Sequence, residues 1–168
     1  MDLYIVRHAI AVDRGDAAFP SDDDRPLSPE GIHKFRLAAR GLSELGMKLD
    51  RIVSSPLLRA RQTAEILKEV AAKRAEMNTA KELRPDAPFD GTLEAVNRYR
   101  DESIAIVGHE PHLSGFTSFL LVGGGELAAI EFKKGAVARL VIPDRPAAGT
   151  ATLEWLIQPG ALRLLAKD

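Results

Sequence analysis

The sequence LYIVRH at residues 3–8 is a short apolar run followed at once by an arginine and a histidine. Such a run is typical of a strand that is buried on both faces of a parallel sheet. Similar runs return at residues 51–54 and 104–107, and they are followed directly by Ser55 and by Gly108-His109. The sequence therefore predicts three strands that each end in residues able to carry chemistry.

Helical patterns separate these runs. Ser28-Pro29-Glu30 is a typical helix start, with an N-cap serine, a proline in the first turn and an acid beside the positive helix end. We expect these elements in chain order: strand 3–6, an exposed polar loop at 13–26, helix 29–45 stopped by Gly46, strand 51–54, a helix opened by residues 54–56 and reaching 71, a loop at 84–91, a short helix at 93–99, strand 104–107, helix 111–122, and strands 137–142 and 152–157.

The alternation of strands and helices predicts an α/β fold. We expect a three-layer sandwich with a mostly parallel central sheet and helices on both faces, to which the last strand pair adds an antiparallel element. No repeat or linker interrupts the sequence, so residues 1–168 are expected to form a single domain.

Composition excludes several kinds of protein. The chain has 168 residues, a formal net charge of −1 and no cysteine, which rules out disulfides, thiolate nucleophiles and cysteine-ligated metals. The balanced charge argues against a nucleic-acid partner. No apolar stretch approaches the roughly 18 residues of a membrane span, and no leader pattern is present. We expect a cytoplasmic protein without a membrane partner, and a monomer because no dimer face is evident.

Ligands of open α/β sheets bind at the carboxyl ends of the strands. There we expect Arg7, His8, Arg59 and His109 to converge. Arginine offers planar, permanently charged donors for a phosphoryl group, and a helix N-terminus adds to the positive potential. A histidine in such a site can act as a nucleophile on phosphorus. Taken singly, a histidine at a strand end is more often a structural residue and an arginine in a first helical turn is usually solvated. The co-location of four such residues at three strand ends is what favours a chemical role.

Four segments carry a family resemblance: LYIVRHA at 3–9, RPLSPEG at 25–31, SSPLLRARQTA at 54–64 and VGH at 107–109. Together they resemble the motifs of the histidine phosphatase (phosphoglycerate mutase-like) superfamily. The short length, with no inserted cap, is similar to the SixA-type phosphohistidine phosphatases. The resemblance covers nearly the whole chain and implies the phosphoglycerate mutase-like fold without a cap insertion.

The resemblance implies a role for each residue expected at the strand ends. His8 is the nucleophile that becomes phosphorylated. Arg7 and Arg59 clamp the phosphoryl oxygens, and His109 completes the pocket. No cofactor and no metal are implied, since the arginines already supply the positive charge that a metal would bring.

Four further positions follow from the same resemblance. Asp22 and Arg25 match an Asp-x-x-Arg pair that lines the pocket in the SixA-type branch. Because a carboxylate repels phosphate, we expect Asp22 to orient an arginine or a water, or to carry a proton. Ala9 replaces the usual glycine of the first motif. No general acid is obvious: Glu82 is the nearest candidate by position, and an exposed loop residue is the competing interpretation.

The resemblance favours a phosphatase that removes phosphate from phosphohistidine on a protein, such as a histidine-containing phosphotransfer domain in a signalling relay. A protonated phosphoimidazole is a good leaving group, so a weak general acid fits that substrate better than a phosphate ester. One alternative is a phosphatase of small phosphate esters or sugar phosphates. The other is a module that binds phosphate or phosphohistidine without turnover.

Overall fold

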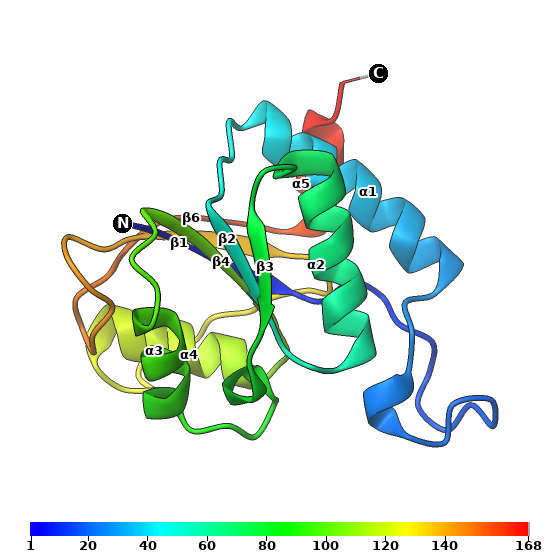
Figure 1. The fold of residues 1–168 in the computed structure, drawn as a ribbon, viewed down its shortest axis with the longest axis horizontal. Helices are drawn as coiled ribbons and strands as arrows, with labels where there is room; N and C mark the ends of the chain where they lie inside the picture. The colour runs from blue at the N-terminus through cyan, green and yellow to red at the C-terminus, as the bar shows by residue number, and fades with distance from the viewer. Residues whose placement is uncertain (168) are drawn as a thin grey trace.

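A six-stranded sheet in the order β3-β2-β4-β1-β5-β6 forms the middle layer of the computed structural model, which describes residues 1–167 (Figure 1). The strands are β1 Asp2–Arg7, β2 Arg51–Ser54, β3 Glu76–Thr79, β4 Ser103–Gly108, β5 Val137–Val141 and β6 Thr152–Ile157. β1, β2, β3 and β4 are parallel, while β5 and β6 run antiparallel at one side. The expected mostly parallel sheet with an antiparallel pair is confirmed.

Helices cover both faces of this sheet, as expected (Figure 1). They are α1 Pro29–Glu44, α2 Leu58–Ala71, α3 Phe89–Asn97, α4 His112–Val122 and α5 Pro159–Leu165, with short 3₁₀ turns η1 Asp22–Asp24 and η2 Lys81–Leu83. α1, α2 and α5 pack on one face, and α3 and α4 pack on the other.

Alternating side chains of the central strands divide the core in two. Tyr4 and Val6 of β1 pack toward α1 and α2, whereas Leu3 and Ile5 of the same strand pack toward α4. This is the two-residue period of a strand that is buried on both faces. Both layers are apolar, so the sheet is held rigidly and its strand ends are fixed in position.

The ends of α1 follow the expected chemistry. The Ser28 side chain accepts a hydrogen bond from the backbone N–H of Gly31 at 3.0 Å, which satisfies one of the free donors of the first turn. Gly46, just past the helix, has a φ of 78°, a conformation that glycine adopts without strain. The predicted start and stop of this helix are confirmed.

Three local expectations need correction. The helix after β2 begins at Leu58 rather than at residues 54–56. The expected loop at 84–91 is interrupted because α3 already begins at Phe89. Residues 13–26 do not form a wholly exposed loop, since Arg25 is only 8% exposed.

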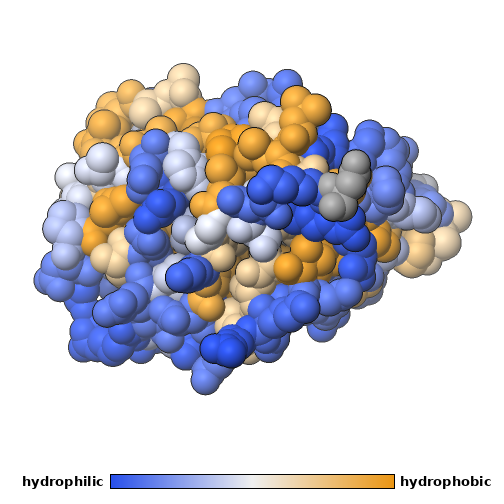
Figure 2. All heavy atoms as spheres, turned by 90° about the horizontal axis from the view of Figure 1, so that it is seen from above, coloured by the Kyte–Doolittle hydropathy of each residue, from blue (hydrophilic) through white to orange (hydrophobic). Residues whose placement is uncertain are grey.

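On the face seen in Figure 2, apolar residues form patches separated by hydrophilic ones. Counting all faces of the molecule, the large apolar side chains that are exposed are Leu45, Val122, Leu127, Val141, Leu153, Leu164 and Leu165. Among residues 1–167, no helix is both long and apolar enough to cross a membrane.

Candidate active site

Three neighbouring strands bring the candidate site together at their carboxyl ends. β4 lies between β1 and β2, with Arg7 opposite Gly108 and Ser54 opposite Val107. Two backbone hydrogen bonds continue this pairing past the strand ends, from the His8 N–H to the Gly108 carbonyl at 3.0 Å and from the Ser55 N–H to the Val107 carbonyl at 2.9 Å. His8, Ser55 and His109 therefore start from positions fixed by the sheet.

His8 has a defined hydrogen position. Its Nδ1 lies 2.7 Å from the carbonyl oxygen of Ala9, and only a protonated nitrogen can pair with a carbonyl. Burial, with the charges of Arg59 and Arg7, lowers the pKa of His8 to about 3, against the hydrogen bond to Ala9, which raises it. At neutral pH the ring is uncharged, so Nε2 carries a free lone pair and can act as a nucleophile.

His109 faces His8, with ring centroids 5.0 Å apart and ring planes inclined by 53°. Its Nε2 lies 2.8 Å from the Ser55 hydroxyl oxygen, while its Nδ1 is buried without a hydrogen-bond partner. Burial, together with the nearby His8 and Arg59, lowers the pKa of His109 to about 2. His109 is therefore a neutral ring at physiological pH.

Arg59 lies in the first turn of α2 and is 2% exposed. Its Nη1 donates to the Asp22 carbonyl at 2.6 Å and its Nη2 to Oδ2 of Asp22 at 2.9 Å. Arg7, at the end of β1, donates from Nη1 to the Phe132 carbonyl. Burial lowers the pKa of both guanidinium groups.

Three polar side-chain atoms of these residues are buried without a partner: Nε of Arg7, Nε of Arg59 and Nδ1 of His109. Buried donors are normally hydrogen-bonded, because an unpaired one costs about 1–3 kcal/mol. Such atoms beside an uncharged histidine form a suitable cradle for an anionic group. A phosphoryl group fits this chemistry, since its oxygens accept from arginine and its phosphorus accepts the His8 lone pair.

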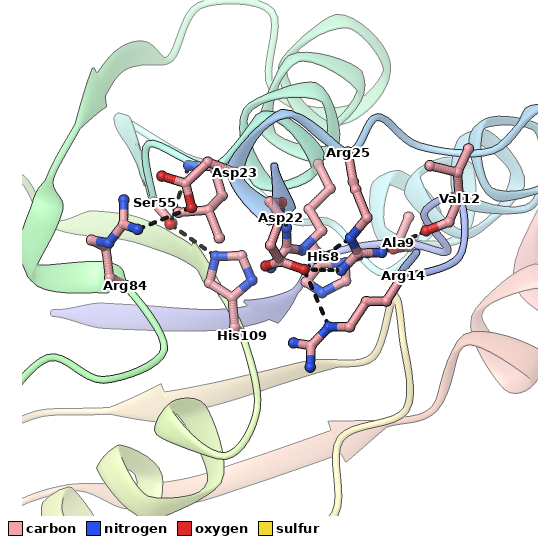
Figure 3. Close-up of polar contacts among 12 residues, drawn as sticks. His8, Ala9, Val12, Arg14, Asp22, Asp23, Arg25, Ser55, Arg84 and His109 are labelled. Atoms are coloured by element: carbon pink, nitrogen blue, oxygen red, sulfur yellow. Dashed lines mark hydrogen bonds and ion pairs between the residues drawn. The ribbon is translucent and has the colours of Figure 1, made fainter. Parts of the chain in front are cut away.

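Asp22 connects the 13–26 segment to this cradle (Figure 3). Besides Arg59, its carboxylate accepts from Nε of Arg25 at 2.9 Å and from Nε of Arg14 at 3.2 Å. Partial burial alone would raise the pKa of Asp22, but hydrogen bonds and charges from Arg25 and Arg59 outweigh it and lower the pKa. Asp22 is thus an ionised carboxylate that holds arginines, not a carrier of a proton. Arg25 is fixed in turn by the Val12 carbonyl.

Ala9 fits its position without the glycine of the usual motif. Among the described residues, every non-glycine residue has a negative φ, so Ala9 is not in a conformation that needs glycine. Its N–H donates to the Thr63 hydroxyl at 3.0 Å, and the side chain is 2% exposed. The methyl group is part of the core rather than an obstacle in the site.

Glu82 is bound to a cation outside the cradle. Its Oε1 accepts from Nη2 of Arg98 at 2.8 Å, and this hydrogen bond lowers the pKa of Glu82. A general acid needs the opposite shift, because it must hold a proton near neutral pH. The structure therefore gives Glu82 the environment of an ion-paired carboxylate.

Two polar residues at the site received no role from the sequence, although Ser55 was expected at a strand end. Ser55 bonds His109, as described above. Glu110 follows His109, and its Oε2 accepts from the Ser114 hydroxyl at 2.6 Å while Oε1 is buried without a partner. Burial raises the pKa of Glu110, against the opposing effects of Ser114 and Arg7. Adjacency to a strand end was the available signal for both residues.

Not every pocket of the surface lies at the candidate site. A pocket of about 400 Å³ beside Asp22 is lined by Arg14, Phe19 and Arg25 among others. A larger one of about 730 Å³ contains Asp2 and Ser103, the first residues of β1 and β4, and so lies at the opposite ends of the strands from His8. Within residues 1–167, no group of three or more His, Asp or Glu is arranged to hold a metal ion.

Comparison with known proteins places the chain in a family. The sequence profile of the histidine phosphatase superfamily (branch 1) matches residues 3–85. An uncharacterized protein of Picosynechococcus is 38% identical over 126 residues, 73% of this chain and 74% of that protein. Phosphohistidine phosphatase SixA of Escherichia coli is 27% identical over 169 residues, 98% of each chain. The structure of the protein histidine phosphatase SixA complexed with tungstate has a TM-score of 0.79 at 25% identity, covering 96% of this chain and 99% of that one.

The chain belongs to the histidine phosphatase superfamily and is a phosphatase. Its fold is the phosphoglycerate mutase-like fold of SixA, which confirms the fold and the family that the sequence motifs indicated.

Proposed function

We propose that the protein hydrolyses phosphohistidine on a protein substrate through a phosphorylated His8. The observation that carries the proposal is the state of His8: its Nδ1 hydrogen is bound to Ala9, and its Nε2 lone pair lies in a cradle of buried, unpartnered nitrogen atoms. A buried neutral histidine beside two arginines is suited to accept a phosphoryl group.

The reaction has two displacements. Nε2 of His8 forms a bond to phosphorus as the bond from phosphorus to the substrate imidazole breaks, and the imidazole leaves with the electron pair of that bond and with the proton that its other ring nitrogen already carries. Arg7, Arg59 and His109 hold the equatorial oxygens, where transition-state charge collects. Water then attacks phosphorus, inorganic phosphate leaves, and His8 regains its lone pair.

The carboxylates support this choice of substrate. The two acids that the sequence suggested, Asp22 and Glu82, are held in the ionised form by arginines, whereas burial raises the pKa of Glu110, whose carboxylate is bound to Ser114. An alkoxide leaving group needs a proton from such an acid, whereas a protonated phosphoimidazole needs little help. SixA of E. coli, which matches this chain end to end, is a phosphohistidine phosphatase by name, and the tungstate-bound structure is of a protein histidine phosphatase.

Phosphate release from a histidine-phosphorylated phosphotransfer domain tests the proposal, measured beside an alkyl phosphate ester, whose alkoxide leaving group needs a general acid. We expect turnover of the phosphoprotein, slow hydrolysis of the ester, and no activity in His8→Ala. His33→Ala is the matched control, because His33 lies in α1 outside the site. The phosphorylated His8 is detected by mass spectrometry at alkaline pH during turnover.

Other outcomes separate the competing functions. Fast hydrolysis of the ester without preference for the phosphoprotein would assign a phosphatase of small phosphate esters. Binding of vanadate without turnover of either substrate would assign a phosphate-binding module and overturn the proposal.

A further inference from the structure

Ser55 contacts the His109 ring on the side that faces away from His8 (Figure 3). It follows β2, is fully buried, and has its backbone fixed by the Val107 carbonyl. Its hydroxyl oxygen lies 2.8 Å from Nε2 of His109, and the Leu57 N–H points at the same oxygen from 3.4 Å. Figure 3 shows that the ring nitrogen not bound to Ser55 lies on the side of His109 that faces His8.

The hydrogens of this contact can be counted. A serine hydroxyl has one hydrogen to donate and can also accept. The Leu57 N–H can only donate, so the hydroxyl accepts there and keeps its own hydrogen for Nε2 of His109. In the reverse arrangement Nε2 donates to Ser55, and the buried hydroxyl hydrogen then has no acceptor among its contacts, which buried polar groups avoid.

The direction of the hydrogen bond between Ser55 and His109 decides whether His109 presents an N–H or a lone pair to the site. If Nε2 accepts from Ser55, a neutral His109 must carry its hydrogen on Nδ1. Nδ1 is the buried atom without a partner, and as an N–H it donates to a phosphoryl oxygen. If Nε2 carries the hydrogen instead, Nδ1 presents a lone pair, which repels the same oxygen.

We propose that Ser55 is a positioning residue that holds His109 as its Nδ1–H tautomer, so that His109 donates a hydrogen bond to the transferring phosphoryl group. The proposal rests on the proposed function for its consequence in turnover, but the tautomer itself is a property of the free protein. Low pKa values of both histidines are consistent with it, because a ring that stays neutral needs its single hydrogen on the correct nitrogen.

The neighbouring serine supplies a matched control. Ser54 is 1% exposed, but its hydroxyl has no hydrogen-bond partner. Ser54→Ala and Ser55→Ala therefore remove the same atom from adjacent buried positions, and only the second removes a contact to His109. Thermal unfolding of both variants shows whether they fold equally well.

The first measurement is the tautomer of His109 in the unmodified protein, read from the ¹⁵N chemical shifts and two-bond ¹H–¹⁵N couplings of the ring at neutral pH. We expect the Nδ1–H form. Observation of the Nε2–H form overturns the proposal whether or not the protein turns over any substrate, and whether or not the variants fold.

The second measurement compares the variants. We expect Ser55→Ala to shift His109 toward a mixture of tautomers and to lower kcat for the phosphoprotein about 10-fold, since one donor to the equatorial oxygens is partly lost. KM is expected to change less, and Ser54→Ala to match the unmodified protein in both. Equal losses in the two variants, or an unchanged tautomer in Ser55→Ala, would contradict the proposal. A protein with the expected tautomers but no phosphatase activity would overturn the proposed function alone.

Discussion

The Asp22 carboxylate and the Arg59 guanidinium form a two-point contact, in which one side-chain oxygen and the backbone carbonyl of Asp22 accept from the two Nη atoms. This contact occupies the outer edge of the guanidinium and leaves its Nε unpartnered. Asp22 therefore orients the arginine toward the cradle.

Asp22→Ala is expected to lower kcat about 10-fold, because Arg59 loses its fixed orientation toward the transferring group. Binding of inorganic phosphate is not expected to weaken, since a negative charge near the anion is also removed. Steady-state kinetics and phosphate titration measure the two effects. Asp23→Ala is the matched control, because the Asp23 carboxylate pairs with Arg84 instead. A parallel loss in both variants would show that the segment, rather than the contact, is responsible.

The free energy of unfolding is expected to fall as the pH decreases below about 6.5. His8 and His109 have lowered pKa values of about 3 and about 2 in the folded protein, so between those values and 6.5 the unfolded chain binds more protons than the folded one. At pH 5 each histidine contributes a loss of about 2 kcal/mol relative to neutral pH. Denaturant unfolding of the protein and of His109→Gln at pH 5 and 7.5 measures this, and the variant should show a smaller pH dependence. An equal pH dependence in His109→Gln would show that His109 does not contribute to the loss of stability at low pH.

Glu82→Gln is expected to change ester and phosphohistidine hydrolysis by less than about 2-fold, because this carboxylate is paired with Arg98 and is not placed to donate a proton. The measurement is kcat for an alkyl phosphate ester, whose alkoxide leaving group needs a proton, and for the phosphoprotein. A large loss confined to the ester would instead identify Glu82 as the general acid of an ester phosphatase.

Ala9→Gly is expected to destabilise the protein by about 1 kcal/mol, since it adds backbone freedom to the unfolded chain and removes a buried methyl group. Activity is expected to be unchanged, because the backbone at Ala9 does not use a positive φ. Thermal unfolding measures the expected loss of stability, and kcat measures the expected unchanged activity. A rise in activity in the variant would show that the methyl group obstructs the site.

Strong local patterns made most of this fold predictable from the sequence. The apolar runs of β1 and β4 and the capped start of α1 carry their signal in a few adjacent residues. β3 was not predicted, because Glu76–Thr79 is a polar edge strand with no apolar alternation. α5 was also missed: it has only seven residues and lies against α1, where a side chain at Gly41 would collide with the Leu162 carbonyl.

The candidate site shows the same division between local and tertiary information. A polar residue at the end of a buried run marks His8 and His109 without any knowledge of packing. The contacts that set their chemistry cross long stretches of sequence: Ser55 to His109, and Asp22 to Arg59. Those pairings depend on strand order and on the path of residues 13–26, neither of which is written in any local pattern.

The position of β1 in the sheet has a consequence for how activity arises. β1 leads directly into His8 but lies between β4 and β5, whose residues come more than 90 positions later in the chain, at 103–108 and 137–141. Contacts of such long sequence separation form slowly and close large loops. During synthesis His8 is made well before the two neighbours of its strand, which are in place only when residues 103–108 and 137–141 have left the ribosome. The growing chain therefore completes the candidate site late, in one step with the closure of the sheet.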